Sequence, residues 1–454
     1  MSRLWIISIL ASVCLLSGCN GGNSQVDLTV IPPGLVSDKV DLDLRCGIVN
    51  NSSSQQHYTA RLYAADSLLA EYSISLEPAC SWAQKHILQA GSLQGKQELL
   101  LKVSTDSEDY LKSETVEILP SPIRSINRIS GAWAGICHWS EEEGKHWNED
   151  IRKLTDEQWR EIVRSMHKLG LDIIVVQELF RNEEYVGRHS STVENYQGKS
   201  YYPSALYSGR MEIAAKDPLE AIFSEADKLG MKVMPGVGLF AWFDFTLESL
   251  EWHKLVAKEL WDRYGHHESF YGFYVSEESG GSLDNWEKSP ELRKQRSDEI
   301  VNFFKGFKAY CSTFAPAKPI MLATNSFGVD GAQGVYKELL KYLDILCPFG
   351  FARMPEWDLT GKEVATILQG LCDGAGSHLW FDQEVFLFNP DNSLYPRDIE
   401  GIIADLTLLD NFEKVLCYQF PGVFSDPEWN FKLGEEKTKK LFVDYTNYLD
   451  SLSR

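Results

Sequence analysis

The chain has 454 residues, 44% of them apolar, and a formal net charge of −21. This length exceeds what one hydrophobic core usually supports, so we expect two domains, and the apolar content excludes a disordered chain. The negative charge excludes nucleic acid as a partner, because proteins that bind it present basic patches.

Residues 1–18 predict a signal peptide. Arg3 supplies a positive charge, and the apolar run over residues 4–16 is too short for a membrane span but fits a signal. Residues 16–19, L-S-G-C, then resemble the signal of bacterial lipoproteins, in which the cysteine is lipidated. We therefore expect lipidation at Cys19, a polar tether over residues 19–25, and a protein lipid-anchored in the cell envelope, at the outer membrane or cell surface of a bacterium. The alternative is an ordinary signal peptide cleaved nearby.

The nine cysteines predict no metal site. Their sequence contains no C-x-x-C pair and no Cys/His spacing typical of zinc. Cys347 and Cys417 lie in apolar runs, which indicates buried, unreactive thiols. A disulfide between Cys46 and Cys80 is compatible with an oxidising compartment, but spacing alone fixes no pairing, so both states stay open.

Residues 26–120 predict an all-β domain. Residues 40–44 alternate between apolar and polar side chains, as a half-buried strand does, and further strands are expected at 58–63, 68–74 and 98–104. Turn-rich segments such as residues 50–54 separate them. This spacing favours an immunoglobulin-like β-sandwich with an accessory role. Carbohydrate binding by this domain stays open.

Residues 121–454 change to alternating strands and helices. Eight strands are expected, at 131–139, 171–179, 231–240, 270–278, 319–326, 344–350, 378–386 and 414–420. Amphipathic segments between and after them predict helices at 156–169, 218–229, 247–264, 290–314, 332–342, 361–372, 396–409 and 435–449. Eight βα units are typical of a (β/α)8 TIM barrel. The alternative of two doubly wound domains is disfavoured, because no Gly-rich phosphate loop follows an early strand.

Acids end the fourth and seventh of these strands. Side chains alternate along a strand, and the apolar set should face the helices, so Glu278 and Glu384 should point into the barrel. Glu277 is then the weaker candidate on the fourth strand, whereas Trp380 and Asp382 share the inward parity of Glu384. Because active sites of such barrels lie at the carboxyl ends of the strands, Glu278 and Glu384 are the candidate acid/base pair.

Other strand-end side chains are candidate ligands for sugar hydroxyls. The long insertion over residues 181–216 adds aromatic side chains above the same face. They either form subsites for a glycan or pack the loop on the barrel, and both alternatives stay open. A strand-end acid can instead cap a helix or pair with an arginine. The candidates are His138, Trp139, Gln177, Glu178, Asn325, Gln419 and, from the insertion, Tyr202.

Two polar clusters are interpreted as non-functional. His266, His267 and Glu268 precede the fourth strand, at the face where special residues serve stability, and adjacent histidines point apart on an extended chain. The run over residues 141–143 is interpreted as a solvated loop, although it lies after the first strand, at the face of the candidate acids. We expect no metal and no cofactor.

The paired acids resemble those of the largest clan of retaining glycoside hydrolases, in which the acid/base follows strand four and the nucleophile follows strand seven. That clan usually has Asn directly before the acid/base, whereas this chain has Glu277 before Glu278. The choice between these two residues therefore stays open.

More narrowly, residues 129–452 resemble the bacterial domain-of-unknown-function family 4434, a glycosidase-like barrel family. The matching stretches are residues 159–172, 202–204, 230–233 and 264–278. This resemblance supports the fold more than the activity. Together with the paired acids, it leads us to expect a retaining glycoside hydrolase that acts on a glycan through Glu278 and Glu384, and we expect a monomer. The alternative is a surface glycan-binding lipoprotein without catalysis.

Overall fold

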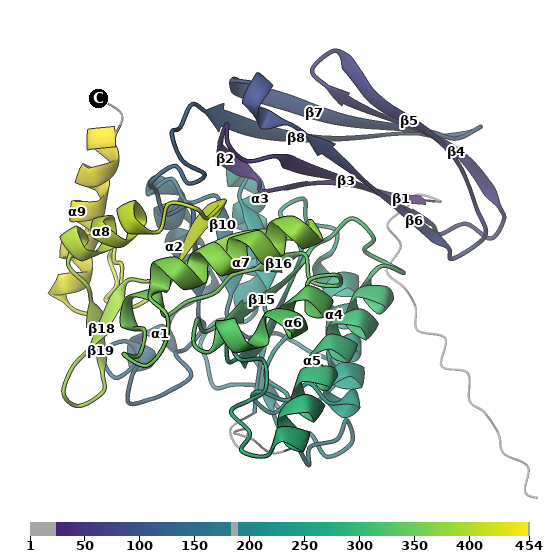
Figure 1. Ribbon diagram of the computed structural model, residues 1–454. Coiled ribbons are helices and arrows are strands. Elements are labelled where there is room, and N and C mark those ends of the chain that lie inside the picture. The colour runs from purple at the N-terminus through teal and green to yellow at the C-terminus, as the bar shows by residue number, and fades with distance from the viewer. Residues whose placement is uncertain (1–23, 183–188, 453–454) are drawn as a thin grey trace, which may run out of the picture.

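The computed structural model describes residues 24–182 and 189–452, which form a β-sandwich and a parallel barrel (Figure 1). The predicted signal, the lipidation site Cys19 and most of the tether lie outside the described residues. In the described part of the chain, no helix is long and apolar enough to cross a membrane.

The sandwich consists of two sheets that share one apolar core. The smaller sheet pairs β1 (Ser24–Ile31), β3 (Leu42–Asn50) and β6 (Ser81–Leu88) antiparallel. The larger has the order β2 (Gly34–Ser37), β8 (Asp109–Leu119), β7 (Gly95–Ser104), β4 (Gln56–Ala64) and β5 (Ser67–Leu76), with a short 3-10 helix η1 (Ala90–Ser92) before β7. Leu28 and Leu44 of the first sheet meet Leu62 and Leu101 of the second in the core. The expected sandwich is confirmed, with β1, β2, β6 and β8 in addition to the predicted strands.

All eight predicted barrel strands are present and parallel. They are β9 (Gly131–Ala134), β10 (Ile173–Val176), β13 (Lys232–Pro235), β14 (Phe273–Ser279), β15 (Ile320–Thr324), β16 (Ile345–Leu346), β17 (His378–Glu384) and β20 (Lys414–Tyr418). Neighbours in the chain are neighbours in the sheet, and bridges from Val233 to Phe270 and from Gly236 to Tyr274 bring its two edges together. The TIM barrel fold is therefore confirmed.

Helices cover the outside of the barrel. They are α2 (Asp156–Lys168), α3 (Pro218–Leu229), α4 (Leu247–Tyr264), α5 (Pro290–Cys311), α6 (Val329–Leu339), α7 (Gly361–Ala375), α8 (Ile399–Leu408) and α9 (Glu436–Leu452). Short elements α1 (Asn148–Ile151), η2 (Phe351–Arg353), β11 (Phe180–Arg181), β12 (Lys199–Ser200), β18 (Phe386–Phe388) and β19 (Leu394–Pro396) lie in the connections. Capping boxes at Thr155 and Thr360 begin α2 and α7, because each threonine accepts a hydrogen bond from the third helical amide.

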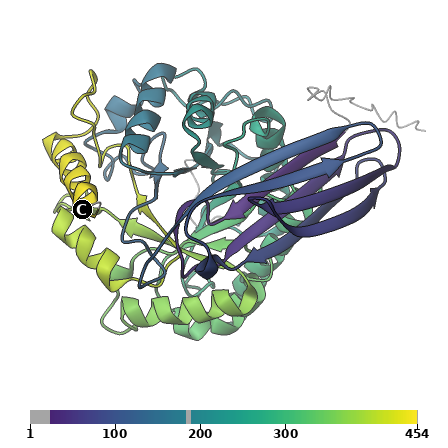
Figure 2. The ribbon, with the colours of Figure 1, turned by 90° about the horizontal axis from the view of Figure 1, so that it is seen from above.

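The sandwich covers the amino-terminal end of the barrel (Figure 2). Tyr271, just before β14, donates its hydroxyl to the carbonyl of Val30 at 2.8 Å. Lys414, at the start of β20, donates to the carbonyl of Leu35 at 3.0 Å and to Asp172 at 2.7 Å. The sandwich therefore leaves the carboxyl ends of the strands uncovered.

The described cysteines are all free. Cys46 is buried in the sandwich core and Cys80 is exposed, and neither forms a disulfide. Cys347 and Cys417 are buried in barrel strands, and burial raises the pKa of both thiols well above its usual range. Both are therefore unreactive thiols, as predicted.

Candidate active site

A cavity of about 280 Å³ opens at the carboxyl ends of the barrel strands. It contains the side chains of seven predicted site residues, which come from β9, β10, β14 and β17 or the segments directly after them. These are His138, Trp139, Gln177, Glu178, Glu278, Asp382 and Glu384. The folded barrel thus brings together residues spread over nearly 250 positions of sequence (384 − 138 = 246).

Strand parity separates Glu278 from Glu277. Ser276 and Glu278 line the cavity, whereas Phe273 and Val275 pack in the core between strands and helices. Glu277 shares the outward parity and is fully buried, and its carboxylate accepts hydrogen bonds from the amides of Phe240 and Ala241. Of the two acids, Glu278 is therefore the one that a ligand in the cavity can reach.

The same alternation arranges β17. Trp380 lies deep inside the barrel, Asp382 is buried above it, and Glu384 reaches the cavity. Burial raises the pKa of Asp382 well above its usual range, and the nearby Glu384 and Glu278 carboxylates add to this rise. Burial therefore favours the protonated, uncharged form of Asp382.

Glu384 is held by Arg353, which ends η2 after β16. The guanidinium Nε donates to both carboxylate oxygens, at 2.8 and 3.1 Å, and a second guanidinium nitrogen lies 2.7 Å from one of them. This two-point geometry fixes the carboxylate in the cavity and supplies its counter-charge.

Glu278 is set to hold a proton near neutral pH. Burial raises its pKa to about 7; Arg353 opposes this rise, and the carboxylates of Glu143 and Glu384 add to it. Glu143, in the loop after β9, is also partly buried, and burial together with Glu142 raises its pKa to about 7. The cavity thus holds two acids that change charge in the range where enzymes operate.

Around them lie polar groups that stay uncharged or paired. Burial lowers the pKa of His138 to about 3, so its imidazole is neutral, and its Nε2 lies 3.5 Å from Glu143. Glu178 pairs with the buried Arg181, whose Nε donates to it at 3.0 Å. Glu178 is therefore the counter-charge of Arg181. Pairing with an arginine was one of the two alternatives to ligand binding for a strand-end acid.

Four other predicted site residues lie away from the cavity. Asn325 is buried and accepts hydrogen bonds from the amides of Gly281 and Phe327. Gln419 and Trp380 are fully buried within the barrel. Tyr202 is also buried, and its hydroxyl donates to Glu259 on α4. None of these four residues lines the cavity, so ligand binding by them stays a prediction.

The insertion after β10 packs mainly on the barrel. Tyr196, Tyr201 and Tyr202 are buried, and Tyr196 contacts Trp252 of α4 with ring centroids 4.8 Å apart. The described part of the insertion thus favours the packing alternative; Tyr185 lies outside the described residues.

An aromatic track leads from the cavity to the surface. Trp139 and Trp242 line the cavity with ring centroids 4.8 Å apart, and Trp242 stacks on Phe243 at 5.2 Å. Phe243 meets Trp286 edge to face at 5.1 Å, and Trp286 is 51% exposed. Of these four residues, which we call the aromatic track, Trp139 and Trp242 line the same cavity as Glu278 and Glu384.

Two important cavity residues were not predicted. Arg353 lies in a loop after β16, without a strand pattern to mark it, and Glu143 was interpreted as part of a solvated run. That interpretation is wrong for Glu143, because the loop after β9 folds back over the cavity and its last acid is partly buried. The one available signal was the position of residues 141–143 after a barrel strand.

Comparisons with known proteins agree with this fold. The family model described as domain of unknown function (DUF4434) matches residues 129–430. A protein of Bacteroides thetaiotaomicron, provisionally named an alpha-L-fucosidase, has 16% sequence identity and a TM-score of 0.52, over 73% of this chain and 96% of that chain. At this identity the similarity shows the fold alone.

Two further structures are more distant. Beta-glucuronidase 2 of Bacteroides uniformis is 12% identical with a TM-score of 0.40, over 88% of this chain and 45% of that one. A beta-galacturonidase of Eisenbergiella tayi is 12% identical with a TM-score of 0.39, over 94% and 72%. No curated protein matches the chain.

Proposed function

The chain belongs to the DUF4434 family, and from the chemistry of its cavity we propose that it is a retaining glycoside hydrolase. The observation that carries the proposal is the position of Glu278. This acid has a pKa of about 7 and lies in one cavity with Glu384, from the carboxyl ends of β14 and β17. A proton donor and a second carboxylate in one pocket are the groups that glycosidic bond hydrolysis requires.

The reaction has two steps. Glu278 gives its proton to the glycosidic oxygen while an oxygen of Glu384 attacks the anomeric carbon, so that the bond to the leaving group breaks and a glycosyl ester forms. Glu278, now ionised, takes a proton from water; the water oxygen attacks the anomeric carbon and releases Glu384. Retention of configuration requires carboxyl groups about 5–5.5 Å apart.

Glu278 is a better proton donor than Glu143, although both have raised pKa values. Glu384 is among the charges that raise the pKa of Glu278, whereas the charges acting on Glu143 are those of Glu142 and Arg353. The donor must lie across the scissile bond from the nucleophile, so proximity to Glu384 favours Glu278.

A second candidate function is glycan binding without catalysis. Arg353 engages both oxygens of Glu384, and attack on an anomeric carbon requires one of them to be released. Glu277, at the position where related hydrolases have Asn, is turned away from the cavity. Both observations fit a barrel that binds sugars and does not cleave them.

Hydrolysis of a broad panel of glycans by the full chain tests the proposal. Glu278→Gln should lower kcat about 10²- to 10⁴-fold on natural substrates, the range for loss of a general acid. With the same variant, the first step should slow much less on an aryl glycoside, because its leaving group needs no proton. Glu384→Gln should lower the rate on both, and the product of the parent should keep its anomeric configuration by proton NMR.

The matched control is Glu142→Gln, an exposed acid beside Glu143. It should keep parental rates. Absence of turnover on the whole panel, with glycan binding unchanged in Glu278→Gln and Glu384→Gln, would reject hydrolysis in favour of the binding function.

We also propose a division of the chain into a signal over 1–18, a lipid-anchored tether over 19–25, an accessory sandwich over 26–120 and the barrel over 121–454. The L-S-G-C stretch at 16–19 supports the anchor at the cell envelope. Cys19→Ala should move the protein from the detergent phase to the aqueous phase. Equal partitioning of variant and parent would reject lipidation at Cys19.

A further inference from the structure

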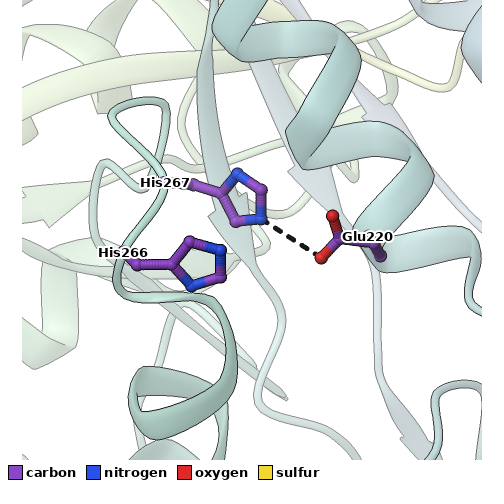
Figure 3. Close-up of side chains that lie close together, drawn as sticks. All are labelled: Glu220, His266 and His267. Atoms are coloured by element: carbon purple, nitrogen blue, oxygen red, sulfur yellow. Dashed lines mark hydrogen bonds and ion pairs between the residues drawn. The ribbon is translucent and has the colours of Figure 1, made fainter. Parts of the chain in front are cut away.

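A cluster of two histidines and a glutamate lies on the outside of the barrel, between α3 and the turn that joins α4 to β14. Glu220 comes from the first turn of α3, and His266 and His267 from the turn. One oxygen or nitrogen of each lies within 4.8 Å of the others (Figure 3). None of the three lines the candidate active site.

The expectation that these adjacent rings point apart is wrong. Residues 265–269 form a turn, so the two imidazoles lie side by side with centroids 4.2 Å apart and an angle of 35° between their planes. In the sequence-based interpretation the third member was Glu268; in the structure it is Glu220, 46 positions before His266 (266 − 220 = 46).

His267 is oriented by groups behind it. Its Nδ1 lies 2.6 Å from Asp227, and Asp227 accepts hydrogen bonds from the amide of Ser269 at 2.8 Å and from its hydroxyl at 2.6 Å. The ring also stacks on Phe223 of α3 at 5.1 Å. A carboxylate behind one ring nitrogen is the usual arrangement for a histidine whose other nitrogen binds a metal.

The contact of His267 with Glu220 then needs a positive charge. When Nδ1–H donates to Asp227, the neutral imidazole presents the lone pair of Nε2 to the Glu220 carboxylate, which lies 3.2 Å away. Two acceptors in contact repel each other. A cation between Nε2 and the carboxylate removes that repulsion, and so does a second proton on His267.

The distances fit zinc. With bonds of about 2.0–2.1 Å, two ligands of a tetrahedral zinc ion lie about 3.4 Å apart. The 3.2 Å separation of His267 Nε2 and Glu220 is close to that value. The ligand atoms of the three residues lie at most 4.8 Å apart. Rotation of the exposed His266 side chain can therefore bring its ring nitrogen to the ligand spacing of about 3.4 Å.

We propose that Glu220, His266 and His267 form a zinc-binding site with water at the fourth position. Two imidazoles and one carboxylate are a ligand set that zinc accepts, and an open fourth position is filled by water. The ion would join α3 to the α4–β14 turn. The site is independent of the proposed hydrolase activity.

Calorimetric titration of the full chain with ZnCl₂, after removal of bound metal with a chelator, tests the proposal. One ion per chain should bind, and zinc should raise the Tm. His266→Ala and Glu220→Gln should each weaken binding at least tenfold and abolish the rise in Tm. Cobalt bound in place of zinc should show the intense visible absorption of a tetrahedral ion.

Asp227→Asn is the sharper variant, because it keeps all three ligands and changes only the group behind His267. It should weaken zinc binding about 10- to 100-fold. His167→Ala, an exposed histidine on α2, is the control and should bind zinc like the parent. No binding by the parent, or equal binding by the parent and His266→Ala, would overturn the proposal.

Discussion

Glu278 lies among charges of both signs, and their balance sets where it titrates. Burial raises its pKa to about 7, Arg353 lowers it, and Glu143, Glu384 and Glu178 raise it. A general acid is active in its protonated form, so its rate is lost as the pH rises through that pKa. The chain therefore offers two substitutions that should move the same pH limb in opposite directions.

We predict that the basic limb of the kcat/KM profile lies near pH 7 in the parent. Glu143→Gln removes a repulsion that disfavours ionised Glu278, so the limb should move to lower pH. Arg353→Met removes an attraction that favours it, so the limb should move to higher pH, each by on the order of one pH unit. Profiles measured on a substrate whose leaving group must be protonated check both, and a limb that stays in place in both variants contradicts the assignment of Glu278.

At the scale of elements, the loop after β14 is held in an unusual backbone conformation. Leu283, Asn285 and Trp286 have φ angles of 54°, 52° and 54°, and Phe243, in the loop after β13, has 65°. The Asn285 amide donates to the carbonyl of Phe243 and joins the two loops. Left-handed non-glycine residues cost free energy and cluster at ligand sites, so we interpret these loops as a support for the aromatic track.

We predict that Trp286→Ala raises KM for an extended glycan and leaves kcat unchanged. Stacked aromatic pairs are worth about 0.5–1.5 kcal/mol, and with a similar contribution from a ring stacked on a sugar the rise should be roughly two- to tenfold. Trp286→Phe keeps a ring face and is the matched control, with KM close to that of the parent. The same KM for Trp286→Ala on long and short substrates would exclude a subsite at this position.

The elements were predictable because hydrophobic periodicity reflects burial. The eight barrel strands and their helices follow from alternation and amphipathic spacing, and strand parity placed Glu278 and Glu384 in the cavity and Glu277 outside it. Parity did not predict Arg353 or Glu143, since both come from loops whose direction depends on tertiary packing. It also did not identify Asn325 and Gln419 as buried, because a strand-end position does not tell how deep a side chain lies.

The turn over residues 265–269 shows a second case in which tertiary packing decides where side chains lie. An extended backbone would separate the rings of His266 and His267, but the α4–β14 connection turns there and α3 supplies Glu220 and Asp227. The sequence shows the adjacent histidines, but a proposed site that takes its third ligand from a helix 46 positions earlier in the chain (266 − 220 = 46) has no complete local signature. Only the fold brings these groups together.

At the scale of the whole molecule, buried charges join the sandwich to the barrel. Arg45 of β3 donates to Asp43 at 2.9 Å and to Asp344, before β16, at 2.6 Å. His378, which begins β17, lies 2.7 Å from Glu413 and 3.2 Å from Asp43. These five residues, the interface network, are buried, so the sandwich and the barrel should unfold together.

We predict that Arg45→Met destabilises the protein by at most about 3–5 kcal/mol, because it removes one partner from each of two buried carboxylates, Asp43 and Asp344, which keep His378 and Lys308. Denaturant unfolding followed by fluorescence and circular dichroism should show the loss and, in the parent, coincident transitions. Arg61→Met removes a pair with Glu71 that is exposed in the sandwich, so it is the control and should leave the midpoint near that of the parent. A parental midpoint for Arg45→Met would contradict a stabilising network.

The last prediction is the pH range over which this network is stable. Burial alone would raise the pKa of Asp344, but Arg45 and Lys308 lower it from 3.8 to about 2, and Arg45 and His378 likewise hold the pKa of Asp43 far below its usual range. Stability from these depressed carboxyl pKa values is complete above about pH 4 and is lost as the pH falls toward 2.

His378 sets the upper end of this pH range. Burial disfavours its charged form, yet Glu413 and Asp43 raise its pKa above 6.5, so its contribution is complete below pH 6.5 and is lost as the pH rises through the folded-state pKa. The Tm should therefore be highest between about pH 4 and 6.5. His378→Gln should flatten the alkaline decline and also weaken the acid decline, because His378 helps to lower the pKa of Asp43. Arg45→Met should weaken the acid decline and leave the alkaline one in place. Identical Tm–pH curves for the parent and His378→Gln would show that this histidine does not couple the two parts of the molecule.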